Sequence, residues 1–344
     1  MPSRPTKTGR LALSVVVPCF NEAQGLPLFV ERMMAAAQAV ARGSYELVLV
    51  NDGSRDATWE VIRGLTARHP AVVGINLTRN HGHQLAVTAG LSLSRGARVL
   101  IIDADLQDPP ELLPDMMARM DEGYDVVYGR RRTRTDESRF KVATAAMFYR
   151  LLGRLSEVDI PVDTGDFRLM SRRIVDRLNA MPEHDRYLRG MVAWLGGAQA
   201  ELLYDRDPRH AGETGYTLRK MLRLAVNGVT SFSTAPLKAA LVLATVGIFI
   251  AAGILIYALI GFFTGSVQPG WTSLALIMVF FGISQLGCLA IIGAYVGRTY
   301  MQLKGRPLFL IDEIATQAPA SPAGRAPAKH PPAARAKTPR RWAG

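Results

Sequence analysis

The 344-residue sequence predicts an α/β domain with a mostly parallel sheet and flanking helices, followed by two C-terminal transmembrane helices. Short apolar, β-branched runs alternate with helical stretches in the first half, and a long uncharged segment follows later. This alternation predicts βαβ units, in which helices cover both faces of a parallel sheet. Ligands of such sheets bind beyond the carboxyl ends of the strands, so functional residues are expected directly after each strand.

The elements of the α/β domain are expected in a regular order. Strands are predicted at 13–17, 45–50, 72–77, 98–102 and 125–128. Crossover helices are predicted between them, at 24–41, 57–68, 84–94 and 110–122.

A run of 59 residues without charge extends from Ala239 to Gly297 and contains one polar interruption, 264–270. The run divides into spans of about 239–263 and 272–296, each long enough to cross a hydrocarbon layer of roughly 30 Å. A pair of buried core helices is the alternative. Two consecutive uncharged segments of this length favour membrane spans.

Basic residues flank the two spans, whereas the loop between them has no charge. This distribution predicts that both termini and the α/β domain lie on the cytosolic side. Apolar residues at helical spacing between Leu218 and Val229 predict an amphipathic helix at the headgroup level, with packing on the domain as the alternative. The flanking residues are Arg219, Lys220, Arg223 and Lys238 before the spans, and Arg298, Lys304 and Arg306 after them.

Composition separates the folded part of the chain from its ends. The formal net charge of +12 suggests an anionic partner, but the tail contributes six Lys and Arg residues and no acid. Its Ala/Pro-rich composition predicts a disordered arm near anionic lipid rather than a nucleic-acid module. The expected boundaries are a flexible N-terminus without a signal peptide at 1–10, the α/β domain at 11–212, a juxtamembrane amphipathic region at 213–236, the spans at 237–298, a cytosolic juxtamembrane segment at 299–314 and the tail at 315–344.

The first candidate site is Asp103-Ala104-Asp105, which directly follows the apolar segment 98–102. Carboxylates two residues apart at a strand end can point the same way and hold a hard divalent cation. A bare Asp-x-Asp tripeptide also occurs by chance in loops and often caps a helix. Its place after a predicted strand favours a site.

Polar residues also follow the first two predicted strands, in segments 18–22 and 51–56. Either loop could merely cap the next helix, as Asp56 is expected to do. Three acidic loops at one sheet edge favour a ligand instead, because a nucleoside needs carboxylate and amide acceptors and a diphosphate needs cations. The nucleoside candidates are Asn21, Glu22 and Asp52, and the diphosphate candidate is Asp105 with a metal.

Three motifs together resemble those of the family 2, GT-A-fold inverting glycosyltransferases: Val-Val-Val-Pro-Cys-Phe-Asn-Glu, Val-Asn-Asp-Gly-Ser-Arg-Asp and Asp-Ala-Asp-Leu-Gln-Asp-Pro-Pro-Glu. The resemblance implies that Asp52 contacts the nucleobase and that Asp103 lies near the donor sugar or ribose. It implies that Asp105, with Gln107, engages Mg²⁺ or Mn²⁺ on the diphosphate. The implied nucleotide-sugar set also includes Pro18, Ala104, Arg79 and Gly82. His81 and His83 lack the further soft ligands of a zinc site.

Motifs in the second half of the chain assign the resemblance to a subgroup of the family. Segments 164–172, 189–194, 209–214 and 231–233 resemble polyprenyl-phosphate glycosyltransferases with a two-span anchor, similar to bacterial undecaprenyl-phosphate glucosyl and aminoarabinosyl transferases and dolichyl-phosphate mannose synthases. The resemblance covers roughly residues 12–310. It implies a UDP-glucose-like donor, undecaprenyl phosphate as acceptor, a bacterial inner membrane and a homo-oligomer. The Gln-x-x-Arg-Trp motif expected of a processive synthase is absent, which favours single-sugar transfer.

The acceptor side is less defined. A polyprenyl monophosphate is largely dianionic at neutral pH and can attack without a general base, so the sequence leaves open whether the enzyme needs one. The acceptor-phosphate candidates are Arg130, Arg131 and Arg209; a solvated basic face is the alternative for each.

Many members of the family carry Lys where Gly215 stands. Asp166 matches a family position near the acceptor and joins Asp103 and Asp105 as a catalytic candidate, with turn chemistry as the alternative.

Two other functions stay open. Transfer to a lipid hydroxyl would make a carboxylate base such as Asp166 essential. A non-catalytic membrane scaffold is the other possibility, against which the intact Asp52, Asp103 and Asp105 count. Donor selectivity depends on a few pocket contacts, so the sequence leaves the sugar, the base and the polyprenol open.

Overall fold

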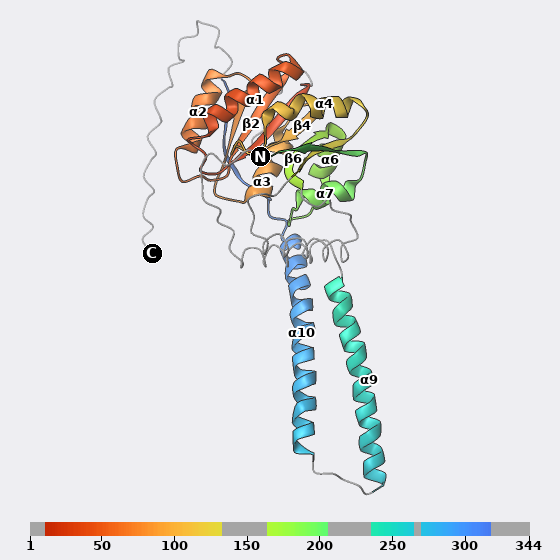
Figure 1. The fold of residues 1–344 in the computed structure, drawn as a ribbon. Coiled ribbons are helices and arrows are strands. Elements are labelled where there is room, and N and C mark those ends of the chain that lie inside the picture. Colours follow the sequence, from red (N-terminus) through yellow and green to blue (C-terminus); the bar gives the residue numbers. More distant parts are fainter. Residues whose placement is uncertain (1–10, 133–163, 206–234, 265–269, 318–344) are drawn as a thin grey trace, which may run out of the picture.

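The computed structural model of the protein describes residues 11–132, 164–205, 235–264 and 270–317 (Figure 1). The predictions for the N-terminal ten residues, the amphipathic helix, Arg209, Gly215 and the tail from residue 318 lie outside the described residues. Cys19 and Cys288 are both free thiols.

The described strands form one eight-stranded sheet in the order β7-β5-β6-β4-β1-β2-β3-β8. Two of them, β6 and β8, run antiparallel to their neighbours. The mostly parallel sheet with flanking helices is therefore confirmed. The strands are β1 (Leu13–Cys19), β2 (Tyr45–Asn51), β3 (Val72–Leu77), β4 (Arg98–Ile101), β5 (Val126–Arg131), β6 (Thr164–Ser171), β7 (Gln199–Tyr204) and β8 (Ile311–Ala315).

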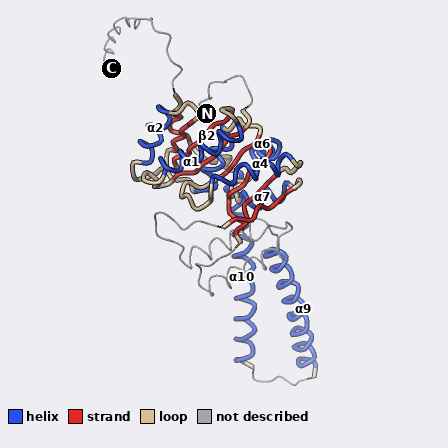
Figure 2. The backbone as a smooth tube through the Cα atoms, turned by 45° about the horizontal axis from the view of Figure 1, so that its top comes forward, coloured by secondary structure: helices blue, strands red, loops and turns tan. Residues whose placement is uncertain are grey.

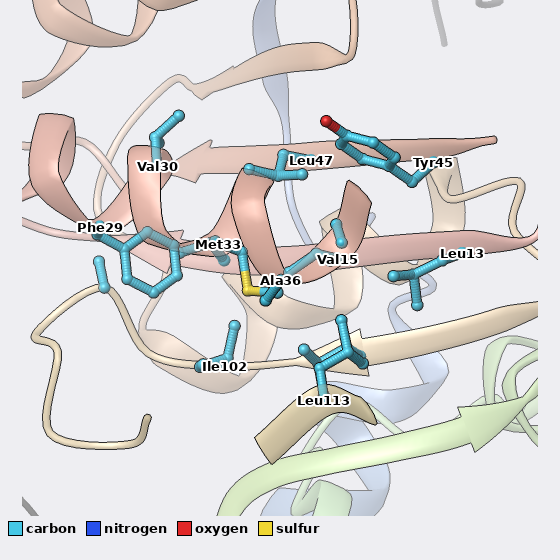
Figure 3. Packing of buried hydrophobic residues seen from close by; sticks show 14 of the residues in the cluster. Leu13, Val15, Phe29, Val30, Met33, Ala36, Tyr45, Leu47, Ile102 and Leu113 are labelled. Carbon is cyan, nitrogen blue, oxygen red and sulfur yellow. The ribbon is translucent and has the colours of Figure 1, made fainter. Parts of the chain in front are cut away.

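Helices cover both faces of the sheet (Figure 2). On one face, Phe29 and Met33 of α1 and Leu113 of α4 pack against the strands (Figure 3). On the other face, α3, α6 and α7 pack around Val16 of β1 and Val48 of β2. The helices are α1 (Leu26–Ala41), α2 (Thr58–Arg68), α3 (His83–Leu93), η1 (Pro110–Leu112), α4 (Leu113–Asp121), α6 (Arg172–Ala180) and α7 (Leu188–Leu195).

Helix α3 lies so close to the sheet that its central glycine has no room for a side chain. A Cβ on Gly90 would overlap Val16 and lie 3.1 Å from Val50. We expect Gly90→Ala to lower the free energy of unfolding by about 1–3 kcal/mol, since overpacking displaces β-branched neighbours. Gly64→Ala on α2 is the matched control, because its Cβ would meet only the end of Arg68 at 3.8 Å. Gly64→Ala should instead raise the free energy of unfolding by up to about 1 kcal/mol, because alanine has the higher helix propensity. Chemical denaturation of the two variants measures both changes.

Two long helices, α9 (Ala235–Phe263) and α10 (Trp271–Leu303), project side by side from the α/β domain (Figure 1). Segments Leu237–Gly261 and Ile277–Leu303 have mean hydropathies of 2.7 and 2.1, and almost none of their described residues is buried in the protein. Their apolar side chains are exposed, which is unlike the buried core helices considered as the alternative. Both are long and apolar enough to cross a membrane.

The chain returns to the α/β domain after α10. Residues 311–315 form β8, which pairs antiparallel with β3 at the edge of the sheet. The sequence pattern predicted only a juxtamembrane segment there. Phe309, just before the strand, is buried in the core cluster beneath α3 and α7.

Candidate functional site

The carboxyl ends of β1, β2 and β4 are neighbours in the sheet, so the loops that follow these strands meet at one edge. The first two loops are bound directly to each other. The Asn21 backbone N–H donates to Ser54 Oγ at 3.0 Å, and the Arg55 N–H donates to Asn21 Oδ1 at 2.9 Å. Glu22 is held similarly, because its N–H donates to Thr58 Oγ1 at 2.9 Å. The structure thus brings the predicted nucleoside candidates together.

Asp52 orders a third loop, which follows β3. Its Oδ1 accepts the backbone N–H of His81 at 2.7 Å, and its Oδ2 accepts that of Gly82 at 2.9 Å. Burial raises the pKa of Asp52, although these two N–H groups oppose the rise. Gly53 makes the close approach possible: it has a φ of +63°, and a Cβ there would overlap the backbone at Asn80. Asp52 therefore shapes the loop that contains two predicted site residues, Arg79 and Gly82.

The loop after β4 contains the two carboxylates of the Asp-x-Asp motif. Asp105 Oδ1 accepts the Gln107 backbone N–H at 3.1 Å, which gives the loop a tight turn. Leu106, between them, has a φ of +59°, a left-handed conformation that residues other than glycine rarely adopt. Its side chain is 2% exposed in the core, and this burial offsets the backbone strain. The packing of Leu106 thus fixes Asp105 and Gln107 in place.

Asp103 and Asp105 provide the hard oxygen donors that Mg²⁺ and Mn²⁺ prefer. Desolvation raises the pKa of Asp103 to about 6; His83 opposes this rise, and the carboxylates of Asp166, Asp108 and Asp105 add to it. A bound cation would relieve this concentration of negative charge. Among the described residues, no three His, Cys, Asp or Glu side chains are grouped to hold a metal ion alone. The donor set fits a cation that phosphate oxygens help to coordinate.

Asp166, on β6, lies at the same edge because β6 runs antiparallel beside β4, with Arg168 opposite Ile101. Its carboxylate is 8% exposed and accepts three hydrogen bonds. His83 Nε2 lies 3.0 Å and Gln84 Nε2 3.0 Å from Oδ2, and Arg189 Nε lies 2.8 Å from Oδ1. Arg168, which is itself buried, is 3.9 Å away.

The electrostatics of Asp166 follow from these partners. Burial alone would raise its pKa, but Arg189, His83 and Arg168 hold the pKa well below the usual range. In return, Asp166 and Asp103 raise the pKa of His83 although burial of the imidazole opposes them. His83 Nε2 is also 3.8 Å from Asp103 Oδ1. His83 therefore lies between the Asp-x-Asp loop and Asp166.

Sequence reasoning missed His83, Gln84, Arg168 and Arg189 as partners of Asp166. His83 begins α3, after the loop that follows β3, so the expectation that functional residues follow the strands applied to it, but the two histidines were considered only as zinc ligands. Arg168 and Arg189 fall inside the segments that carried the resemblance. No spacing indicates that they converge on one carboxylate.

The two adjacent arginines predicted for the acceptor differ in position. Arg130, largely exposed, pairs with Glu201 at 2.9 Å. Arg131, on the opposite face of β5, has a guanidinium NH₂ group 3.7 Å from the place where a Cβ of Gly165 would lie. Its Nε is buried without a hydrogen bond to any described residue. Arg131 is thus the one of the two whose guanidinium lies beside Gly165, the residue before Asp166.

The loop after β4 is bound to the far end of the sheet by a residue that sequence reasoning did not select. The Tyr204 hydroxyl on β7 donates to Asp108 Oδ1, and both residues are buried. Burial, with the nearby Asp108, raises the pKa of Tyr204, so the phenol stays protonated and donates. The Tyr204 ring also packs edge-on against Phe167, with centroids 5.8 Å apart.

We expect His83→Ala to lower transfer activity by about 10–100-fold, because the side chain positions both Asp103 and Asp166. His83→Gln keeps an N–H donor of similar length and should recover part of the loss. His69→Gln, at the C-terminal end of α2, is the control and should leave activity unchanged. Steady-state kinetics with the donor varied tests this. Equal activity of His83→Ala and the control would contradict the role.

Comparisons with known proteins identify relatives of the chain. Residues 14–178 match the model of glycosyl transferase family 2. The chain is 43% identical over 304 residues to the uncharacterized glycosyltransferase YkcC of Bacillus subtilis, covering 87% of this chain and 93% of the relative. It is 36% identical over 308 residues to the prophage bactoprenol glucosyl transferase homolog of Escherichia coli, covering 88% and 99%. Mannosyltransferase PcManGT of Pyrobaculum calidifontis superposes with a TM-score of 0.45 at 18% identity, covering 82% of this chain and 88% of that one. The protein belongs to glycosyltransferase family 2.

Proposed function

We propose that the protein transfers one sugar from a nucleotide-diphosphate sugar, of the UDP-glucose type, to a polyprenyl phosphate, undecaprenyl phosphate in bacteria. The observation that carries the proposal is an acidic strand-end site on a domain continuous with two membrane-length helices. The bactoprenol glucosyl transferases of Shigella phages SfII and SfX, each 36% identical to this chain, support the acceptor class.

The donor would lie across the loops that follow β1, β2 and β4. Asn21, Glu22 and Asp52 are proposed to recognise the nucleoside, with Pro18, Arg79, Gly82 and Ala104 completing the pocket. Asp103 is proposed to face the sugar or ribose. Asp105 and Gln107 would hold Mg²⁺ or Mn²⁺, which supplies charge stabilisation for the departing nucleoside diphosphate. The turn around Leu106 keeps this pair in one orientation before the donor binds.

The acceptor phosphate oxygen would attack the anomeric carbon from the side opposite the leaving group, so the configuration inverts. Arg131, with Arg209 and a released Arg130, is proposed to hold this phosphate in line. Asp166 is proposed to act as a counterion, because a carboxylate paired with two arginines and a low pKa is a weak base. This weakness counts against transfer to a lipid hydroxyl, which would need a strong base.

We place the enzyme in a bacterial inner membrane, with α9 and α10 spanning it and both termini in the cytosol. Lys238 near the start of α9 and Arg298 and Lys304 near the end of α10 support this orientation. A homo-oligomer is proposed as well, on the family resemblance alone.

Purified protein in vesicles containing undecaprenyl phosphate tests the proposal. Each of four labelled donors, UDP-glucose, UDP-galactose, UDP-N-acetylglucosamine and GDP-mannose, is supplied in turn with Mg²⁺ or Mn²⁺. We expect one of them to yield an organic-phase product, and we expect EDTA to abolish its formation and added Mn²⁺ to restore it. Folded protein that gives no product with any donor would refute the function, and product formed in EDTA would refute the cation.

A further inference from the structure

A short segment joins the end of α10 to the edge strand of the sheet. Helix α10 ends at Leu303, and β8 begins at Ile311. The connection, Lys304–Leu310, spans at most about 25 Å when fully extended. Gly305, near its start, has a φ of +57°, a left-handed conformation that does not continue the helix. The position of the sheet edge is therefore restricted by the position of α10.

The returning segment is firmly attached to the domain. Phe309 is 6% exposed within the core cluster that also contains Leu77 and Leu91. The Thr78 N–H donates to the Leu310 carbonyl at 3.0 Å, and β8 continues the ladder along β3 from there. Beyond β8, Gln317 Nε2 donates to the Ala67 carbonyl at 3.3 Å. We call residues 304–315 the strap.

A series of side-chain hydrogen bonds runs from the strap to the site. Asn76 Nδ2 on β3 donates to Asp312 Oδ2 at 3.2 Å, and Asn76 Oδ1 accepts from Asn51 Nδ2 at 2.7 Å. Asn51 Oδ1 accepts the backbone N–H of Ser54 at 3.3 Å. Ser54 Oγ, in turn, accepts the N–H of Asn21. The strap thus contacts, through two asparagines, the loops that carry the nucleoside candidates.

The domain also contacts α10 itself. Arg298 NH1, near the end of this helix, lies 3.4 Å from Asp185 Oδ2 in the segment before α7. Helix α7 contributes Arg189 to the Asp166 cluster. Both sides of the site are therefore connected to the same end of α10.

We propose that the strap is a positioning element that fixes the donor site in height and orientation over the bilayer, so that a phosphate held at the membrane surface meets the donor in line. The proposal rests on the proposed function. A reactive geometry tolerates deviations of only about 1 Å, and an acceptor confined to the bilayer cannot follow a displaced site. An acceptor dissolved in water can follow the displaced site. The strap should therefore matter for the first kind of acceptor and not for the second.

Inserting Gly-Ser-Gly-Ser between Gly305 and Arg306 lengthens the connection and leaves every strap contact with β3 available. In vesicles, we expect the full-length variant to lose at least about tenfold in transfer to undecaprenyl phosphate. Transfer to a short, water-soluble prenyl phosphate and nucleotide-sugar binding should be unchanged. The same insertion at the exposed turn Arg42–Gly43 is the matched control and should affect neither reaction. Unchanged transfer to undecaprenyl phosphate, or equal losses with both acceptors, would overturn the proposal.

A second measurement does not depend on transfer. The variant Cys288→Ser keeps only Cys19, which is buried, and Arg63→Cys adds an exposed thiol that can carry a fluorophore. Energy transfer from this fluorophore to a dye in the bilayer then reports the distance between the domain and the membrane. We expect the insertion after Gly305 to change this energy transfer and the control insertion to leave it constant. If neither insertion changes the energy transfer, the proposed role of the strap is overturned, even if the wild-type protein transfers no sugar. Wild-type inactivity with a changed value refutes only the proposed function.

Discussion

Asp105→Asn is expected to reduce sugar transfer by about 10²–10³-fold, because it removes a charge that would hold the cation on the departing diphosphate. The shape of the side chain is kept, and the amide oxygen can still accept the Gln107 N–H. The loss should therefore appear in kcat and in Mn²⁺ affinity rather than in folding. Initial rates over a Mn²⁺ titration, with the fold checked by circular dichroism, provide the measurement.

Asp115→Asn is the control for that substitution. Asp115 is an exposed carboxylate in the first turn of α4 within the same domain, so it tests the general effect of removing one negative charge. It should leave both rate and Mn²⁺ affinity unchanged. If Asp105→Asn kept wild-type activity at low Mn²⁺, the cation would have to be held elsewhere.

The largest effect on stability is expected from Asp166→Ala, at about 3–5 kcal/mol in the free energy of unfolding. The substitution removes the partner of Arg168, whose side chain is 5% exposed, and leaves that cation buried with no carboxylate beside it among the described residues. It also releases His83, Gln84 and Arg189. Denaturant unfolding of the purified protein measures the change. The exposed pair Arg119–Glu122 supplies the control, since Glu122→Ala should cost less than about 0.5 kcal/mol.

A second substitution tests the cause. Adding Arg168→Met to Asp166→Ala removes the uncompensated charge and should recover part of the lost stability. Transfer should stay low, because His83 and Arg189 still lack their common partner. A double variant less stable than Asp166→Ala would show that the cost comes from packing rather than from the buried charge.

The five predicted strands and four crossover helices are all present, because apolar periodicity is a local property and each of these elements buries its own stripe. Strand β8 was missed for a physical reason. It has five residues, two of them acidic, and it pairs with a strand more than 230 residues earlier. An unpaired edge of β3 favours such a strand, and a sequence does not reveal which edge stays open.

The candidate site likewise contains residues that the sequence pattern identified and residues that it did not. Asp103 and Asp105 were identifiable because they follow a central strand, and the carboxyl ends of neighbouring parallel strands meet. The partners of Asp166 could not be identified from the sequence, since His83 begins α3 and Arg189 lies on α7, two helices far apart in the chain that only the fold brings together. The difference between Arg130 and Arg131 likewise depends on which face of β5 each side chain occupies.

The sequence alone determined the α/β domain, the two membrane-length helices and the acidic loops, because each depends on short-range pattern and on strand order. The tertiary structure decided that Asp166 is a buried, fully paired carboxylate with a low pKa. It also decided that the segment after α10 returns to the sheet edge next to the nucleoside loops. Both outcomes arise from contacts between residues far apart in the chain, whose energies depend on burial and charge in the folded protein.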